Sequence, residues 1–366
     1  MRVTFIISSI CSGGAERVVA TMANFWAKKG WTITLLTLDD GEHQPFYELD
    51  PAITHRPLAV AGTSKNIWQR VVNNVRRMFA LRAAIRKSAP RIVISAMTET
   101  NVLTLLATMG LRVPVFVQEH TDPHEHRLAK PWELLRGLTY PRATNVVVLG
   151  QRSLAYFSPA IQQRARVIPN PIFVSVNTKV EHGQGRRGNG RTVMAMGRLS
   201  PQKGFDSLIR AFAKIAARHP EWSLKVWGEG PMRAELELLA RELGIESRVK
   251  LPGRTSDPFE KLREADLFVL SSHYEGFPMA LCEAMACGVP VISFDCPSGP
   301  GEIIRDGVDG FLAPAGDVEA LGVAMSHLMA DPIKRQEFAR HAPEILDRFG
   351  VQRIMGVWDS LIRAAL

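Results

Sequence analysis

Short apolar runs alternate with helical patterns along most of this 366-residue chain, and no other feature constrains its fold as much. Residues 3–10 and 32–38 have the length and composition of buried strands. Between them, residues 15–28 repeat apolar side chains with the period of a helix, which Gly30 ends. Strand–helix–strand units of this kind build parallel sheets, so we predict an α/β protein.

The alternation occurs in two series that are separated by a break. Pro169, Asn170 and Pro171 end the first series, and residues 180–190 have the Gly-rich composition of a flexible linker. We predict further strands of the first series at residues 92–95, 113–118 and 145–149. In the second series we predict strands at residues 193–196, 223–227, 248–251, 267–271 and 289–294. The helices predicted in the second series are at residues 205–217, 232–243 and 258–264.

The length of the chain suits two domains better than one core. We predict two Rossmann-like domains, residues 1–173 and residues 191–349, that face each other across a cleft. A C-terminal helix near residues 350–366 is expected to pack back on the first domain. In open α/β sheets ligands bind beyond the carboxyl ends of the strands, so the chemistry is expected in the loops at those ends.

Positive charge is concentrated in the first half of the chain. Lys and Arg outnumber Asp and Glu by 45 to 36 overall, but up to Val174 the numbers are 21 and 11, and beyond it they are 24 and 25. The N-terminal domain is therefore expected to meet an anionic partner. No window of 18 residues is free of charges, Pro and turn signals, so any membrane contact is expected to be peripheral.

The cysteines show no pattern of paired spacing and no CxxC motif. Cys11, Cys282, Cys287 and Cys296 each lie among apolar or small residues. We interpret them as reduced structural thiols of a cytosolic protein.

Two acids stand in an otherwise apolar stretch, HYEGFPMALCEAMACG at residues 273–288. Glu275 lies in the loop after a predicted strand, and Glu283 lies inside the following helix, for which Pro278 suits the first position. The start of that helix offers free N–H groups and a partial positive charge, which together attract an anion. Carboxylates on either side of such a site could accept the hydroxyls of a nucleotide sugar. The alternative is a half-exposed Glu283 and a Glu275 that is favoured only by the helix dipole.

Glycine-containing loops follow the first predicted strand of each domain. In GRLSPQKG at residues 197–204, Arg198 and Lys203 can face phosphate oxygens, and a solvated basic loop is the alternative. Gly13 and Gly14 let the backbone approach a ligand at a helix start, and a plain tight turn is the alternative. Neither a complete GxGxxG fingerprint nor a Walker lysine motif occurs, which argues against ordinary dinucleotide and P-loop sites.

Taken together, these residues resemble family 4 of the retaining glycosyltransferases, which have the GT-B fold. Glu275 and Glu283 match the E-x7-E signature of that family in EGFPMALCEAMACGVPVI. The stretches GGAERVV, GRLSPQKGFDSLIRAF, VWGEGPMRAELELLA and VKLPGRTSDP match the same family in the same order, so the resemblance covers nearly the whole chain. It implies two Rossmann-like domains, with the nucleotide sugar mostly on the second and the acceptor on the first.

The resemblance also implies roles for individual residues. Arg198 and Lys203 would neutralise the donor diphosphate as the bond to the sugar breaks. Glu283 would bind the ribose hydroxyls, and Glu275 those of the transferred sugar. The implied catalytic set is His120, Arg198, Lys203 and Glu275, and the implied donor-binding set is Gly13, Gly14, Arg198, Lys203, Glu275, Gly276, Phe277, Pro278, Met279, Ala280 and Glu283.

His120 follows the strand predicted at residues 113–118 and matches a family histidine near the sugar. His124 and His126 follow closely, so the alternative is that any of the three is a surface residue.

No metal, and no cofactor besides the donor itself, is expected. The sequence contains no Asp-x-Asp, the usual carboxylate pair for Mg²⁺. The family uses basic side chains and helix ends in its place. With no evident nucleophile, the resemblance implies front-side attack, in which the leaving phosphate helps to deprotonate the acceptor.

Residues 65–91 carry eight basic side chains and no acid. Apolar residues including Trp68, Val72, Val75 and Phe79 recur there at intervals of three and four, as in a basic amphipathic helix that lies on an anionic membrane. The alternative is a helix packed on the sheet of its own domain with a solvated basic face.

The start GGAERV and the stretch DCPSGPGE at residues 295–302 look most like family members that build bacterial surface polysaccharides or lipid-linked oligosaccharides. This implies transfer of a hexose or N-acetylhexosamine from a UDP-sugar to a saccharide, with an undecaprenyl-diphosphate-linked sugar as the expected acceptor. The expected location is the cytoplasm, at the inner face of the cytoplasmic membrane.

Two other functions were weighed against this one. A nucleotide-sugar epimerase of the same architecture would need acid and base groups placed for proton abstraction, and the E-x7-E stretch argues against it. A nucleic-acid-binding protein would explain the basic half, but the basic segment lacks interleaved aromatic side chains on which bases could stack, so no nucleic acid is expected.

Overall fold

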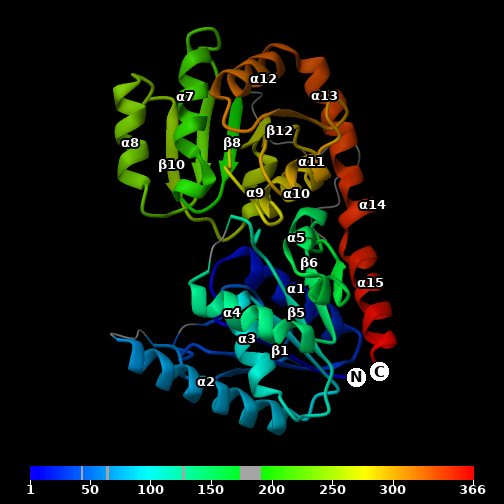
Figure 1. Ribbon diagram of the computed structural model, residues 1–366. Helices are drawn as coiled ribbons and strands as arrows, with labels where there is room; N and C mark the ends of the chain where they lie inside the picture. The colour runs from blue at the N-terminus through cyan, green and yellow to red at the C-terminus, as the bar shows by residue number, and fades with distance from the viewer. Residues whose placement is uncertain (43, 63–65, 126–127, 174–190) are drawn as a thin grey trace. The chain divides into compact units, whose positions relative to one another are not determined.

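The protein was analysed as a computed structural model that describes residues 1–42, 44–62, 66–125, 128–173 and 191–366. The chain divides into two compact units, Met1–Pro171 with Gln352–Leu366, and Ile172–Val351. Each unit contains one parallel β-sheet (Figure 1). The predicted linker at residues 180–190 lies outside the described residues.

The boundary between the units differs slightly from the expected limits of 173 and 349. Ile172 donates its N–H to the carbonyl of Phe349 (2.8 Å) and accepts from the N–H of Val351 (3.1 Å). These two hydrogen bonds form an isolated parallel bridge to Gly350. Ile172 therefore belongs to the second unit.

The first unit has a seven-stranded sheet in the order β3-β2-β1-β4-β5-β6-β7. Its strands are β1 (Arg2–Ile7), β2 (Thr32–Thr37), β3 (Thr54–Pro57), β4 (Ile92–Ala96), β5 (Val115–Gln118), β6 (Asn145–Val148) and β7 (Ala165–Val167). Its helices are α1 (Gly14–Lys28), α2 (Ile67–Ser88), α3 (Thr98–Ala107), α4 (Lys130–Thr139), the short turn η1 (Tyr140–Arg142), α5 (Gln151–Tyr156), α6 (Pro159–Gln162) and α15 (Val351–Ala364). Helix α15 belongs to this unit from Gln352 on.

Five of these strands were predicted, because central strands of a parallel sheet are buried on both faces and are apolar throughout. The sequence analysis missed β3 and β7, which form the two edges of the sheet. Strand β3 reads Thr-His-Arg-Pro and is half-exposed, and β7 has three residues. Edge strands face solvent and need no apolar run, so they give no strong signal.

The second unit has a six-stranded sheet in the order β10-β9-β8-β11-β12-β13. Its strands are β8 (Thr192–Met196), β9 (Ser223–Trp227), β10 (Val249–Gly253), β11 (Leu267–Leu270), β12 (Val291–Asp295) and β13 (Gly310–Pro314). Its helices are η3 (Pro201–Lys203), α7 (Phe205–Ala216), α8 (Arg233–Glu242), α9 (Pro258–Arg263), α10 (Met279–Ala286), α11 (Pro300–Ile303), α12 (Val318–Ala330), α13 (Pro332–His341), η4 (Ala342–Glu344) and α14 (Ile345–Phe349).

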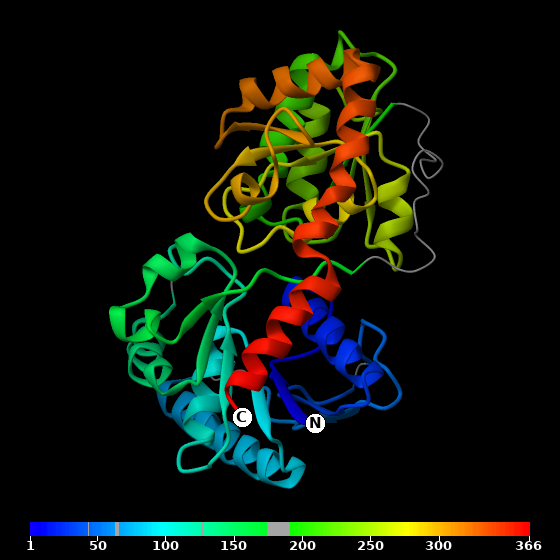
Figure 2. The same ribbon diagram turned by 90° about the vertical axis from the view of Figure 1, so that its right-hand side faces the viewer.

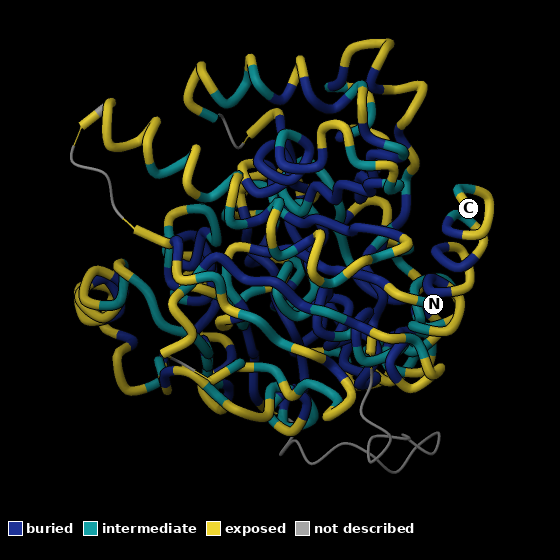
Figure 3. The backbone as a smooth tube through the Cα atoms, turned by 90° about the horizontal axis from the view of Figure 1, so that it is seen from below, coloured by how far each residue is buried: buried dark blue, intermediate teal, exposed yellow. Residues whose placement is uncertain are grey.

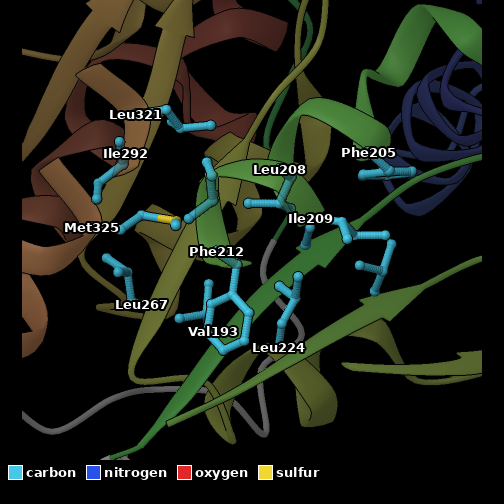
Figure 4. Close-up of a cluster of buried hydrophobic side chains, with 14 of the residues drawn as sticks. Val193, Phe205, Leu208, Ile209, Phe212, Leu224, Leu267, Ile292, Leu321 and Met325 are labelled. Carbon is cyan, nitrogen blue, oxygen red and sulfur yellow. The ribbon is translucent and has the colours of Figure 1, made fainter. Parts of the chain in front are cut away.

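The core of the second unit lies between its sheet and the helices α7 and α12. Phe212 of α7 and Met325 of α12 pack with strand residues such as Val193 and Ile292, all fully buried (Figure 4). Figure 3 shows the same division along the backbone, with buried strands inside and exposed positions on loops and outer helix turns. The strand ends are thereby held rigidly, which is what a binding site at those ends requires.

Both sheets reverse their strand order at one place. In the second sheet the chain runs from β8 outward to β9 and β10, and then returns to β11 on the other side of β8. The chain therefore leaves the neighbouring strands β8 and β11 toward opposite sides of the sheet, and the loops that follow them begin next to each other at its carboxyl edge. Ligands of open α/β sheets bind at such a switch point.

The C-terminal helix α15 packs against α1 of the first unit (Figure 2). The rings of Trp26 and Trp358 meet edge to face, with centroids 6.4 Å apart. The buried carboxylate of Asp359 accepts hydrogen bonds from Trp26 Nε1 (2.7 Å) and from Lys29 Nζ (2.7 Å). One acid thus connects the last helix of the chain to the first.

Asp359→Ala is expected to lower the free energy of unfolding of the first unit by about 2–3 kcal/mol, because the buried indole N–H of Trp26 loses its acceptor. Ser360→Ala is the matched control, since the exposed Ser360 hydroxyl bonds only within its own helix, to the carbonyl of Gly356. Urea unfolding followed by tryptophan fluorescence measures both. Equal changes in the two variants would show that Asp359 does not hold the helix.

Candidate active site

Hydrogen bonds join the loops after β8 and β11. Ser271 Oγ donates to the carbonyl of Lys203 (2.9 Å), and the N–H of His273 donates to the carbonyl of Gln202 (2.8 Å). Gln202 Nε2 donates in turn to the carbonyl of Tyr274 (3.0 Å). Residues 72 positions apart in the sequence are thus held side by side at the switch point.

Gly204 makes this close approach of the loops feasible. Its φ of 56° lies in the left-handed region, and a Cβ at this position would stand 2.2 Å from the carbonyl oxygen of Ser271. A side chain would therefore push the two loops apart.

Lys203 and Glu275 meet where the loops touch. Lys203 Nζ lies 2.6 Å from Glu275 Oε1, and Ser272 Oγ donates to the same oxygen over 2.6 Å. The Glu275 side chain is 7% exposed and that of Lys203 21%. The other carboxylate oxygen, Oε2, makes no hydrogen bond to a described residue, so it can accept one from a ligand hydroxyl.

Glu283 lies inside α10 and is 2% exposed. The alternative of a half-exposed Glu283 and a Glu275 favoured only by the helix dipole is therefore wrong, because Glu283 is buried and Glu275 is buried with Lys203 and Ser272 as partners. Burial of two acids within nine residues is costly unless each has polar partners. For Glu275 those partners are Lys203 and Ser272.

Helix α10 begins one residue later than predicted. Pro278 is its N-cap, with φ −75° and ψ 82°, and Met279 is the first helical residue. Pro278 still fits, because its φ of −75° is close to the value that the proline ring fixes and it needs no N–H donor. No side chain caps this end, so the first-turn amides of Met279 and Ala280 keep donors for an anion. Gly276 and Phe277 precede the cap, and the Phe277 ring packs edge to face on Phe349.

Arg198 is exposed at the end of β8 and makes no ion pair with a described residue. It therefore differs from Lys203, whose charge is already matched by Glu275. The second unit thus offers an available guanidinium, a paired ammonium and uncapped helix amides at one edge of its sheet. That combination can hold a diphosphate.

The glycine loop of the first unit lies at the start of α1. Gly13 is the N-cap in an extended conformation, and α1 begins at Gly14. A Cβ on Gly13 would lie 2.2 Å from Glu16 Oε2, whereas a Cβ on Gly14 would meet nothing within 4 Å. The Glu16 carboxylate is the end of a flexible side chain that can move aside, so internal packing requires neither glycine.

His120 follows β5 in the first unit. Both of its ring nitrogens are shielded from solvent and have no hydrogen-bond partner in the structure. Burial lowers the pKa of His120 to about 4, so the ring is neutral near pH 7. His124 is exposed, and His126 lies outside the described residues. Of His120 and His124, only His120 therefore resembles a site residue.

Comparison with known proteins identifies the family. The family model Glycosyltransferase Family 4 matches residues 12–175, and the model Glycosyl transferases group 1 matches residues 177–345. The two matches follow each other and together span most of the chain. The chain belongs to the family 4 glycosyltransferases.

Relatives of this glycosyltransferase act in bacterial glycan synthesis according to their names. It is 27% identical over 99% of its length to the GalNAc-alpha-(1->4)-GalNAc-alpha-(1->3)-diNAcBac-PP-undecaprenol alpha-1,4-N-acetyl-D-galactosaminyltransferase of Campylobacter jejuni, of which it covers 98%. It is 28% identical over 99% of its length to an exopolysaccharide phosphotransferase of Streptomyces coelicolor, and spans 40% of that protein.

A solved structure supports the fold of the glycosyltransferase. Anabaena HepE in complex with UDP and glucose superimposes with a TM-score of 0.79 at 21% identity, over 99% of both chains. The predicted α/β class with two Rossmann-like domains is confirmed.

The sequence analysis missed several polar partners in the glycosyltransferase. Ser272 was not singled out, although it lies three residues before Glu275 and donates to it. Glu119, 2% exposed, was also missed. It directly follows the apolar strand before His120, so the reasoning applied to Glu275, that a buried acid needs partners, would have found it.

Helix α2 has two apolar faces. Leu81 and Ile85 are buried against the first unit, whereas Trp68 is 80% exposed and Phe79 61%. The outer face, defined as Trp68, Val71, Val72, Val75 and Phe79, is exposed throughout. The helix therefore packs on its own domain, as the second interpretation expected, and also presents an exposed apolar face. Contact of that face with a membrane stays a prediction.

The basic residues of α2 fall into two groups. Arg70, Arg76, Arg86 and Lys87 are exposed. Arg77 donates to the carbonyls of Val60 (3.0 Å) and Gly62 (3.0 Å), and Arg82 donates to those of Ala107 and Met109 (2.7 Å each). These two arginines stabilise the fold and are not available as a surface charge.

The described part of the chain shows neither a metal-binding cluster nor a membrane-spanning helix. No group of three or more His, Cys, Asp and Glu side chains within it could hold a metal ion. Every helix in that part is too short or too polar to span a bilayer.

Proposed function

We propose that this glycosyltransferase moves a hexose or N-acetylhexosamine from a UDP-sugar to a saccharide acceptor, with retention of configuration, in the synthesis of a bacterial polysaccharide or lipid-linked glycan. The observation that carries the proposal is the meeting of Lys203 and Glu275 beside the uncapped start of α10. A cation for the diphosphate and an acid for the sugar stand together there.

Each residue has a role in this proposal. The exposed guanidinium of Arg198 and the ammonium of Lys203 face the diphosphate, together with the amides of Met279 and Ala280. Glu275 accepts hydroxyls of the transferred sugar through Oε2, and Glu283 accepts those of the ribose. The neutral ring of His120 contributes to the transfer itself.

Positive charge at the leaving group lowers the barrier most. As the bond to the sugar breaks, negative charge grows on the diphosphate, and fixed donors aimed at that charge stabilise the transition state more than the ground state. In front-side attack the same phosphate takes the proton of the acceptor hydroxyl. The bond to the new oxygen then forms on the face from which the nucleotide leaves, which retains the configuration.

A thermal-shift panel of UDP-, GDP- and ADP-sugars tests donor binding. A ligand at 100 times its Kd adds about 2.7 kcal/mol of stability, so one nucleotide should raise the melting temperature clearly above the others. We expect the UDP-sugars to do so, and an Arg198→Ala/Lys203→Ala variant to lose most of the shift. A panel without any shift would contradict the donor assignment.

Transfer activity is expected to survive chelation, because Arg198, Lys203 and the α10 amides supply the positive charge at the leaving diphosphate. The measurement is the initial rate in excess EDTA against the rate with added Mg²⁺ or Mn²⁺, with a twofold difference at most. Complete loss of activity in EDTA that either ion restores would show that a metal takes part.

The acceptor is proposed to be a saccharide on undecaprenyl diphosphate, reached at the cytoplasmic face of the membrane. The outer face of α2 supports this, because exposed apolar side chains lie there near the exposed cations Arg76, Arg86 and Lys87. Apolar groups enter the headgroup layer and cations attract anionic lipids. The epimerase and nucleic-acid interpretations gain no support from the family to which the chain belongs.

A further inference from the structure

No hydrogen bond from another described residue holds the ring of His120. Its two nitrogens are shielded and unpartnered, so no hydrogen bond of its own fixes the ring. The orientation of the side chain must then depend on the main chain that carries it and on packing. Any role of His120 therefore depends on the contacts that fix its main chain.

The two residues before His120 are held through their backbone. The carbonyl of Gln118 accepts from the N–H of Met97 (3.2 Å) and from Asn101 Nδ2 (2.8 Å). The N–H of Glu119 donates to the carbonyl of Val147 (2.9 Å). Strand β5 is thus anchored to the start of α3 and to strand β6 at its last residues.

The side chain of Glu119 adds a second set of anchors. Thr98 Oγ1 donates to Oε2 over 2.7 Å, and the Tyr140 hydroxyl donates to Oε1. Asn101 Nδ2 donates to the same hydroxyl over 3.1 Å. Burial, and then the negative charge of Glu119, raise the pKa of Tyr140 well above its usual range, so the hydroxyl keeps its proton and remains a donor.

A buried carboxylate of this kind is costly. An apolar side chain at position 119 would fill the same space and would not have to be removed from water as a charged carboxylate is. Buried polar groups of this sort contribute more to a single arrangement of the residues around them than to the stability of the fold. The network connects the ends of β4 and β5 with η1, and its centre is the residue next to His120.

We infer that Glu119, Thr98 and Tyr140 are positioning residues that set the main chain at position 119 and through it the ring of His120. The inference rests on the proposed function, in which His120 contributes to transfer. A role in folding alone would use the same hydrogen bonds, so the two must be separated by their coupling to His120.

Tyr140→Phe is the first variant, because it removes only the hydroxyl that Glu119 and Asn101 share. Its matched control is Tyr156→Phe, since Tyr156 also contacts the Phe157 ring, edge to face where Tyr140 is stacked, while its hydroxyl lies 3.3 Å or more from Glu133. We expect Tyr140→Phe to lower kcat about tenfold or more with the donor KM unchanged within twofold, and Tyr156→Phe to change neither.

The double variant His120→Ala/Tyr140→Phe decides between positioning and folding. If Tyr140 acts through His120, the double variant is no slower than His120→Ala, within twofold. Independent losses that multiply would overturn the inference. If His120→Ala itself keeps wild-type activity, both the proposed role of His120 and this inference fail, whereas a slow His120→Ala with multiplying losses refutes only the inference. Thr98→Val, which removes the other donor to Glu119, repeats the test should Tyr140→Phe fold poorly.

Discussion

Glu275→Gln is expected to lower kcat/KM for sugar transfer about a hundredfold or more. The amide keeps the size of the side chain but removes the charge that strengthens its hydrogen bonds. Hydrogen bonds to charged groups contribute about 1.5–3 kcal/mol each, so two sugar hydroxyls account for that loss. Lys203→Ala and Arg198→Ala should each cost about tenfold to a hundredfold, and Glu283→Ala should chiefly weaken nucleotide binding.

The control for Glu275→Gln is Glu264→Gln. Glu264 pairs with Lys261 at 2.8 Å in the same unit and lies outside the proposed site. It should leave kcat/KM unchanged. Glu275→Gln also deprives Lys203 of its partner, so we expect a modest loss of about 1–2 kcal/mol in the free energy of unfolding. If turnover stays normal while only the melting temperature falls, the buried acid is structural.

The second large effect is expected at the outer face of α2. Trp68→Ser, Val72→Ser and Phe79→Ser together should weaken binding to anionic liposomes at least thirtyfold, because large apolar side chains no longer enter the headgroup layer. Arg76→Gln with Arg86→Gln should weaken it to a similar degree, since each cation near an anionic surface contributes about 1 kcal/mol. Co-sedimentation at low and high salt measures both.

The choice of these arginines follows from the structure. Substitution of Arg77 or Arg82 would remove hydrogen bonds to two backbone carbonyls in each case and so confound binding with folding. Val323→Ser with Ile333→Ser is the control for the apolar variant, because both side chains are exposed, by 65% and 76%, in the second unit. Equal partitioning of the wild type to neutral and anionic liposomes would contradict the membrane proposal.

Sequence patterns located the central strands but not the pairing of the site residues. Strand β9 has the predicted bounds, because the turns on either side of it leave little choice of where the strand begins and ends. Lys203 and Glu275 were both proposed as ligand-binding residues, yet nothing in their spacing shows that they touch each other. That contact follows from the adjacency of β8 and β11, which depends on the order of strands in the sheet.

Helix α2 shows a different limit of periodicity. Phe79 and Ile85 both fit an apolar repeat of three and four, but one is exposed and the other buried. When both faces of a helix carry apolar side chains, the repeat cannot tell which face packs inward. Hydrogen bonds from Arg77 and Arg82 to neighbouring loops decide it, and these bonds depend on tertiary structure.

The most direct test of the central claim is a transfer assay with an undecaprenyl-diphosphate-linked saccharide and a panel of nucleotide sugars, in which mass spectrometry detects the product and proton NMR gives its anomeric configuration. The account predicts that a UDP-sugar yields a product longer by one hexose or N-acetylhexosamine, with the α configuration of the donor kept, and that Glu275→Gln slows the formation of this product about a hundredfold or more. A product of inverted configuration, or full activity in Glu275→Gln, would contradict the account.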